Sequence, residues 1–342
     1  MTSNGSNGLE PVEEGGALLR AGFPYVKTVG MRRVTWYPID VALGDEGRLY
    51  CLGRFDAAGL IRVINWDDDD LGGIGSGLVW PSSIIRDHEE VLYVSDEATH
   101  TVTVMKRDGE QVAKWGEHGS EPGQLDHPSH MAFDAEEHLW ISDAMNHRVQ
   151  RLSKQGEYIS SFGTYGDGEG EFNMPWGIAL DAEGCVYVVD WRNDRVQKFT
   201  ADGEFLMSFG TSGDGDGQFN RPAGIAVDGH GDIYVVDRGN NRVQLFDRSG
   251  RYVEQFRGDS TLGKMGRIYI LANPKVLRLR EMAKLEPQKL FRAPASVRLD
   301  NEGHMYVADF GCHRIQIYKK EAYPLTAAEV MPHPGAPSLS TV

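Results

Sequence analysis

Cysteine is scarce in this sequence, which has only Cys51, Cys185 and Cys312 among its 342 residues. Because their number is odd and they are widely separated, neither a disulfide framework nor a paired-cysteine metal site is available. The sequence also lacks a continuous apolar run of about 18 residues, which a transmembrane helix requires. Residues 1–16 lack the basic start and apolar centre of a secretory signal. We therefore expect reduced thiols, a cytoplasmic location and no membrane partner.

Basic residues are fewer than acidic ones. The chain has 35 Lys and Arg against 50 Asp and Glu, so its net charge is −15 at pH 7. Such a charge repels the phosphate backbone of nucleic acids. We therefore do not expect a nucleic-acid partner, and the candidate partners are an unknown protein or a small molecule.

Glycine and proline are abundant, with 41 Gly and 15 Pro, which indicates many short strands joined by tight turns. Three segments lie 47 residues apart and resemble one another closely; the second reads PWGIALDAEGCVYVVDWRNDRVQKF. Three weaker copies complete the series. The six copies begin at Pro38, Pro81, Pro128, Pro175, Pro222 and Pro294.

Each copy contains three short β runs, and a fourth run such as GEFLMSFG follows. Four antiparallel strands in a unit of about 45 residues are typical of a propeller blade. The last copy ends near Tyr318 without its fourth strand, whereas residues 23–30 match that strand. Pairing of the first strand with the last would remove the exposed edges. We therefore predict an all-β, six-bladed β-propeller over residues 22–320, closed by an N-terminal strand, with flexible tails at 1–21 and 321–342.

Three motifs recur in the strongest copies: GxFxxPxGIAxD, as at residues 217–228, the strand end YVVD, and NxRVQxF. In these motifs the sequence resembles the NHL-repeat family of six-bladed propellers. Members of this family serve as protein-interaction platforms, as RNA-binding modules or as a zinc-dependent peptide-amidating lyase. The resemblance therefore implies the fold and leaves several functions open.

The geometry of a blade predicts where a site should lie. The start of the innermost strand and the turn between strands two and three lie at the same end of an up-and-down blade, so residues there should surround the mouth of the axial channel. His130 lies on an inner strand where its relatives have glycine, and it is the candidate catalytic residue if the protein is an enzyme. An alternative is that these residues form only a variable polar rim. The candidate binding residues are Asp40, His127, Trp176, Trp191, Arg221, Arg238 and Phe310.

A zinc site requires at least three convergent nitrogen, oxygen or sulfur ligands. The amidating lyase of the family takes its ligands from histidines of different blades, but the positions equivalent to His130 in other blades of this chain carry Asp, Ser or Gly and no second histidine. The resemblance is therefore weakened at this centre. No cofactor is the primary expectation, and the alternative is a divalent metal, zinc or calcium, held by His130, Asp40 and His118.

Other histidines and acidic residues follow the repeat. In four blades an Asp precedes an Arg by five positions, which indicates structural ion pairs. His100, His147 and His313 occupy the position before that Arg or its equivalent, where other blades have Asp194 or Asn241. We therefore expect these three histidines to stabilise turns.

One interval breaks the periodicity. Pro222 and Pro294 are 72 residues apart, and the added segment contains Asn273 and Pro274, which resemble a helix N-cap and first helical residue. Residues 257–292 carry nine basic and three acidic side chains. We therefore expect a basic helical insertion that opens onto the mouth as a lid. Its charge would either tether it to the acidic propeller or place it over an anionic ligand.

Two hypotheses of function follow. The primary one is a binding or interaction module that holds a protein partner or a small ligand, anionic or not, at the axial funnel, because the repeat framework is complete and a catalytic set is not. The alternative is a lyase or hydrolase at the same funnel. In that alternative His130, with or without a divalent metal, polarises the substrate while Arg221 and Trp176 orient it.

Overall fold

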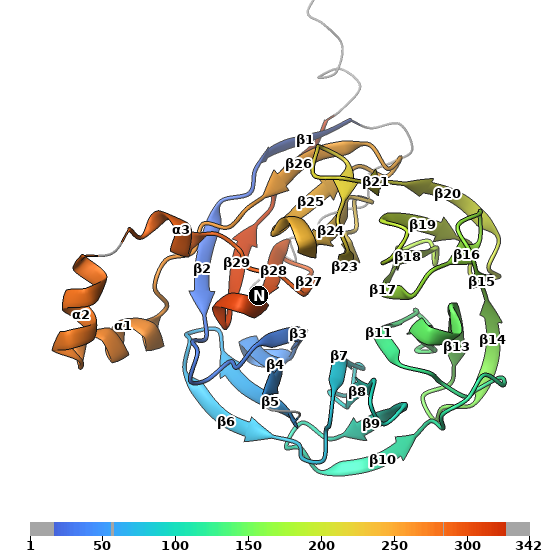
Figure 1. Ribbon diagram of the computed structural model, residues 1–342, viewed down its shortest axis with the longest axis horizontal. Helices are drawn as coiled ribbons and strands as arrows, with labels where there is room; N and C mark the ends of the chain where they lie inside the picture. The colour runs from blue at the N-terminus through green and yellow to red at the C-terminus, as the bar shows by residue number, and fades with distance from the viewer. Residues whose placement is uncertain (1–16, 56–57, 283, 326–342) are drawn as a thin grey trace, which may run out of the picture.

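The structure is a computed structural model that describes residues 17–55, 58–282 and 284–325. Six four-stranded antiparallel sheets are arranged as blades around a central axis (Figure 1). The predicted six-bladed β-propeller is confirmed.

The strands of each blade are given from the inner to the outer edge. Blade one has β3 (Pro38–Leu43), β4 (Arg48–Phe55), β5 (Ala58–Asn65) and β6 (Asp70–Ile74), and blade two has β7 (Pro81–Arg86), β8 (Leu92–Asp96), β9 (Thr101–Met105) and β10 (Gln111–Trp115). Blade three has β11 (Pro128–Phe133), β12 (Leu139–Asp143), β13 (Arg148–Leu152) and β14 (Tyr158–Phe162), and blade four has β17 (Pro175–Leu180), β18 (Val186–Asp190), β19 (Arg195–Phe199) and β20 (Phe205–Phe209). Blade five has β23 (Pro222–Val227), β24 (Ile233–Asp237), β25 (Arg242–Phe246) and β26 (Tyr252–Phe256), and blade six has β27 (Ser296–Leu299), β28 (His304–Asp309), β29 (Arg314–Lys319) and β2 (Tyr25–Val29). Short parallel pairs stand before blades four and five: β15 (Thr164–Tyr165) with β16 (Glu171–Phe172), and β21 (Thr211–Ser212) with β22 (Gln218–Phe219).

The hydrophobic core lies between neighbouring blades. Strands β18 and β24 are buried along their whole length, because both faces of a blade pack against the blades beside it. Val189 and Phe219 pack with Ile233 and Phe246 in the cluster between blades four and five. The outer strand β20 alternates partly buried and exposed residues, since one of its faces meets solvent.

The ring is closed by an N-terminal strand, β2, which forms the outer edge of blade six. Strand β2 pairs antiparallel with β29, with Val29 opposite Ile315 and Thr28 opposite Gln316. Val29 is fully buried. The predicted closure by an N-terminal strand is confirmed.

The predicted tail boundaries need a correction, because a second pair of strands extends the closure. Strand β1 (Ala17–Gly22) pairs with β30 (Glu321–Leu325). Arg20 forms an ion pair with Asp232 of blade five, and the Lys320 amine lies 2.8 Å from the same carboxylate. These charges hold both terminal segments against blade five, so the ordered structure begins before residue 22 and continues beyond residue 320. The rest of both predicted tails lies outside the described residues.

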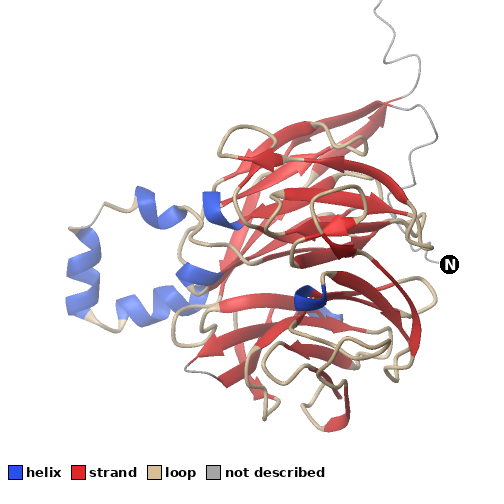
Figure 2. Cartoon of the chain, turned by 45° about the vertical axis from the view of Figure 1, so that its right-hand side comes forward, coloured by secondary structure: helices blue, strands red, loops and turns tan. Residues whose placement is uncertain are grey.

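The insertion is helical, as predicted, and contains α1 (Lys264–Leu271), α2 (Pro274–Glu281) and α3 (Glu286–Lys289). It projects from the side of the ring beside β2, as Figures 1 and 2 show, and does not cover the mouth. Its two ends are held together, because the N–H of Phe291 donates to the carbonyl of Arg257 at 2.8 Å and the N–H of Ser260 to that of Lys289 at 3.1 Å. The chain therefore leaves and rejoins the ring at one place, and the lid prediction is corrected to a lateral arm.

Acidic residues of blade one attach this arm. The buried Asp68 carboxylate accepts the N–H of Met265 at 2.9 Å and that of Gly30 at 2.7 Å. Asp69 forms an ion pair with Lys264. The tethering alternative for the basic insertion thus holds at its first helix.

Within the described part of the chain, no helix has the length and apolarity that crossing a membrane requires.

Candidate ligand-binding site

A cavity of about 840 Å³ opens at the centre of the ring. Inner strands and the turns after second strands supply its lining, and four blades contribute aromatic rings. The lining residues are Tyr37, Ile39, Arg54, Trp80, Ser82, His130, Trp176, Trp191, Arg221, Ala223, Arg238, Gly239, Asn241, Ala293, Ala295 and Phe310. Its volume is within the usual range for small-molecule sites.

A repeated hydrogen-bond pattern fixes the residue before the proline in five of the six blades. In blade five, the N–H of Arg221 donates to Asp194 Oδ1 of the preceding blade at 2.7 Å, and the N–H of Asn220 donates to Asp237 Oδ1 at 2.8 Å. These two bonds hold Arg221 at a φ of 53°, in the left-handed region. The backbone thereby directs this side chain from the start of β23 to the cavity.

In other blades a histidine imidazole takes the place of the Asp194 carboxylate and accepts the N–H of the residue before the proline. His147 Nδ1 accepts the N–H of Met174 at 3.1 Å, and His313 Nδ1 accepts that of Tyr37 at 3.1 Å. The predicted turn role of these two histidines is confirmed.

The predicted Asp–Arg ion pairs are also present: Asp143–Arg148 (2.9 Å), Asp190–Arg195 (2.9 Å), Asp237–Arg242 (2.7 Å) and Asp309–Arg314 (2.7 Å).

Each cavity arginine lies over an aromatic ring. The guanidinium carbon of Arg221 is 4.6 Å from the centroid of Trp191, and that of Arg238 is 4.8 Å from the centroid of Phe310. Trp191 in turn lies 5.7 Å from Trp176, centroid to centroid. Such contacts hold flat cationic groups against flat apolar faces. Arg238 and Phe310 begin the 3-10 turns η3 (Arg238–Asn240) and η4 (Phe310–Cys312), which follow β24 and β28.

The cavity is electropositive in an otherwise acidic protein. Arg54 forms an ion pair with Glu97, but Arg221 and Arg238 have no ion pair with any described residue. The part of the lining that the structure describes contains no carboxylate. Burial, with a smaller contribution from the nearby Arg54 charge, lowers the pKa of Arg238. The pocket thus presents two unneutralised guanidinium groups.

His130 faces this cavity from β11. Its side chain is almost completely buried, with 4% of the residue exposed, and it makes no hydrogen bond with the described residues. Burial lowers the pKa of His130 to about 4, and the charge of Arg298 adds to this effect, while Asp40 opposes it. The imidazole is therefore neutral near pH 7 and can offer one donor and one acceptor to a ligand.

Comparison with known proteins identifies the repeat. The NHL repeat family matches residues 172–199 and 219–246, which span most of blades four and five. The six sheets establish the architecture, and the match identifies two of its repeats. The chain is a six-bladed β-propeller that carries NHL repeats. The comparison with curated protein sequences found no match.

Solved structures similar to this NHL propeller include enzymes. Virginiamycin B lyase from Staphylococcus aureus is 13% identical with a TM-score of 0.57, and the alignment covers 87% of this chain and 99% of the lyase. A gluconolactonase from Xanthomonas campestris is 13% identical with a TM-score of 0.59, over 89% of this chain and 100% of that one. A protein of unknown function from Bacteroides thetaiotaomicron is 20% identical with a TM-score of 0.57, over 91% and 73%. At these identities the similarity shows the fold alone.

Most predicted site residues of the NHL propeller meet at one place. The candidates that line the cavity are His130, Trp176, Trp191, Arg221, Arg238 and Phe310. Their roles in binding or catalysis stay predictions. Arg54 was missed, although it follows the second-strand motif of blade one in the position that Trp191 holds in blade four; the degenerate ending LYCLG hid this alignment.

Two predicted binding residues lie elsewhere. Asp40 is completely buried and does not line the cavity, because its carboxylate pairs with Arg298 and accepts bonds from Ser83 and Ile84. His127 is also outside the lining, and its Nδ1 lies 2.6 Å from Asp126 Oδ1.

The predicted metal set is not assembled. Asp40 is neutralised by Arg298, and no group of potential ligands in the described chain contains His130 or Asp40. His118 lies instead beside His100, with ring centroids 4.2 Å apart. The cavity lining therefore does not fit a zinc or calcium ion, since it combines guanidinium groups with a single imidazole.

Proposed function

We propose that this NHL propeller binds a small molecule that carries an anionic group, such as a carboxylate, on a flat apolar body. The observation that carries the proposal is the pair of guanidinium groups of Arg221 and Arg238. Both line the cavity, and neither has an ion pair among the described residues. The carboxylate of such a ligand would accept two parallel hydrogen bonds from either guanidinium group, and these bonds are strong because the site is partly desolvated.

The remaining lining supports an apolar ligand body. Trp176 and Trp191 of blade four present indole faces, and Phe310 adds a phenyl ring from blade six. Aromatic faces stack favourably on flat ligands. The neutral His130 can hydrogen-bond a hydroxyl or carbonyl group at the inner strand.

A small molecule fits the site better than a protein surface does. The cavity is concave, with about 840 Å³ of space. Stable protein interfaces instead require about 800 Å² of surface on each partner. We therefore test small-molecule binding first, and binding of a protein partner is the hypothesis that a negative result would favour.

The test compares an aromatic carboxylate with its neutral analogue. Calorimetric titration with 1-naphthoate and with 1-naphthamide should show binding of the anion at least tenfold tighter than that of the amide. Arg238→Gln should remove most of this difference, because it removes one unpaired charge from the lining. Arg192→Gln is the matched control, since Arg192 also contacts Trp191, at 5.5 Å, but does not line the cavity.

Equal affinity for the acid and the amide would contradict the proposal. So would an Arg238→Gln variant that binds the acid as tightly as the Arg192→Gln control. If neither compound binds wild-type protein, the small-molecule function is wrong and a protein partner becomes the leading hypothesis.

A second candidate function is a lyase or hydrolase. It is supported by the unpartnered, cavity-facing imidazole of His130 and by structural neighbours that include a lyase and a gluconolactonase. In this function His130 would accept or donate a proton while Arg221 and Trp176 orient the substrate. A pKa of about 4 makes the free imidazole a weak base at neutral pH, which favours the binding function. The test is turnover of gluconolactone and virginiamycin B by wild-type protein and by His130→Asn; turnover that the variant retains would exclude this role of His130.

A further inference from the structure

A cluster of three imidazoles and one carboxylate lies outside the axial cavity, where blades two and three meet. We propose that His100, His118, Asp126 and His127 form a binding site for a transition-metal ion, Zn²⁺ in the first place. Asp126 Oδ1 is at the centre of the cluster. It lies 2.6 Å from His127 Nδ1, 3.4 Å from His100 Nδ1 and 3.6 Å from His118 Nε2.

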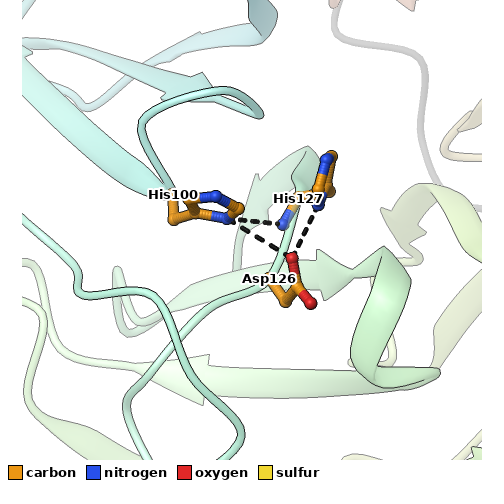
Figure 3. Close-up of side chains that lie close together, drawn as sticks. All are labelled: His100, Asp126 and His127. Carbon is orange, nitrogen blue, oxygen red and sulfur yellow. Dashed lines mark hydrogen bonds and ion pairs between the residues drawn. The ribbon is translucent and has the colours of Figure 1, made fainter.

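These separations suit tetrahedral coordination. Metal–ligand distances of about 2.0–2.1 Å place neighbouring ligand atoms of a tetrahedral site about 3.3–3.4 Å apart. The ligand atoms of His100, Asp126 and His127 all lie within 4.8 Å of one another. Figure 3 shows the two imidazoles on either side of the Asp126 carboxylate. For four ligands the 2.6 Å pair has to open and His118, which is not part of this group, has to move closer; both imidazoles are exposed, His127 to 48% and His118 to 64%.

The backbone brings the four residues together from different segments. His100 ends the turn between β8 and β9, whereas Asp126 and His127 lie directly before β11. His118 is held beside them by a parallel bridge to Leu125. His100 and His127 both adopt left-handed backbone conformations, with φ of 57° and 53°. The site would therefore connect blade two to the inner strand of blade three.

The turn role of His100 does not account for the cluster. His100 Nδ1 accepts the N–H of His127 at 3.2 Å, as His147 Nδ1 does for Met174 in the next blade. That bond explains one imidazole per turn. It does not explain His118, whose side chain is 64% exposed, or the side chain of His127. On metal binding, His100 Nδ1 would give up its hydrogen bond from the N–H of His127 and coordinate the ion together with the other ligands.

The ligand types select the metal. Three imidazoles with one carboxylate favour Zn²⁺, whereas Ca²⁺ and Mg²⁺ require mainly oxygen ligands. With His118 in the fourth position the site is closed, as structural zinc sites are. The other potential group in the described chain, Asp181, Glu183 and Cys185, carries no such proposal, because Asp181 already contacts Lys198 at 3.0 Å and Tyr187 at 3.1 Å.

The experiment uses the full chain without an affinity tag, freed of metal by a chelator. Calorimetric titration with ZnCl₂ should show one tight site per chain, and CaCl₂ should show none. His118→Ala and His100→Asn should each weaken Zn²⁺ binding at least 100-fold. The asparagine keeps the turn acceptor, as Asn241 shows by accepting the N–H of Ala293 at 2.7 Å. His147→Asn is the matched control, because it makes the same change in a turn that belongs to no ligand group in the described chain.

A second measurement covers the case in which one variant folds poorly. Equimolar Zn²⁺ should raise the unfolding temperature of wild-type protein and of His147→Asn, but not that of the exposed-site variant His118→Ala. Absence of stoichiometric Zn²⁺ binding to wild-type protein would overturn the proposal, and so would unchanged affinity in His118→Ala and His100→Asn. Zn²⁺ binding should persist in Arg238→Gln, so this proposal and the proposed function fail independently.

Discussion

The carboxylate of Asp40 accepts two hydrogen bonds from the guanidinium group of Arg298, one of them at 2.9 Å, and this pair connects blade one to blade six. Asp40 also accepts the hydroxyl of Ser83 at 2.8 Å and the N–H of Ile84 at 2.9 Å, both from blade two. One buried side chain thus ties three inner strands together. Burial raises the pKa of Asp40, but Arg298 outweighs this effect and lowers it, so the carboxylate stays ionised.

Asp40→Asn should destabilise the protein by about 3 kcal/mol, because it leaves the largely buried charge of Arg298 without its counter-ion. Urea unfolding at pH 7 measures the loss. Asp70→Asn, which breaks the more exposed ion pair with Arg62, is the control and should cost less than about 1 kcal/mol. Similar losses in the two variants would show that the Asp40 pair has no special role.

A close approach of two inner strands gives a second prediction. A Cβ atom on Gly177 would lie 2.2 Å from the carbonyl oxygen of Ala223, whereas one on Gly229 would meet nothing within 4 Å. Gly177→Ala should therefore cost about 2–3 kcal/mol through overpacking. Gly229→Ala should change stability by less than about 1 kcal/mol. Urea unfolding of the two variants decides, and equal stabilities would contradict the backbone contact between β17 and β23.

The repeat made the fold predictable, and irregular positions limited the prediction of the site. Proline spacing and the YVVD ends determine the blades, so the rim positions of Trp176, Arg221 and Arg238 followed from alignment alone. Asp40 fits the same alignment, yet its partner Arg298 comes from blade six, 258 residues away in sequence, and draws it out of the lining. Such pairing between blades has no local sequence signal.

The insertion and the histidine cluster show the same limit. Helical character could be read from Asn273 and Pro274, but the direction of the arm depends on the contacts of Asp68 with Gly30 and Met265. His118 and His100 are 18 residues apart in sequence, and only the packing of the β10–β11 connection brings their rings together. Tertiary contacts therefore decided both outcomes.

Removal of the closing strand should be far more damaging than removal of the strand before it. A variant that begins at Phe23 lacks β1 and loses the Arg20–Asp232 ion pair, and we expect a modestly lower unfolding temperature. A variant that begins at Met31 also lacks β2, which exposes the edge of β29 and the space that Val29 fills. We expect this variant to aggregate or unfold, since open strand edges pair with other chains. Circular dichroism melts and gel filtration compare the two, and equal behaviour would refute closure by β2.

The burial of His130 should make stability depend on pH in a defined range. Its pKa is about 4 in the folded protein and about 6.5 in an unfolded chain. Between these values the unfolded chain binds a proton that the folded protein does not, so stability falls as the pH decreases. From pH 7 to pH 5 this single group should account for a loss of about 2 kcal/mol.

Comparison of wild-type protein with His130→Asn isolates that contribution, because every other titrating group is present in both. Urea unfolding at pH 7, 6 and 5 should give a steeper loss of stability for wild-type protein, with the two curves converging toward low pH. Parallel curves would mean that the folded protein protonates His130 as readily as the unfolded chain does. The imidazole would then be charged at mildly acidic pH, and the cavity would present a third unpaired cation beside Arg221 and Arg238.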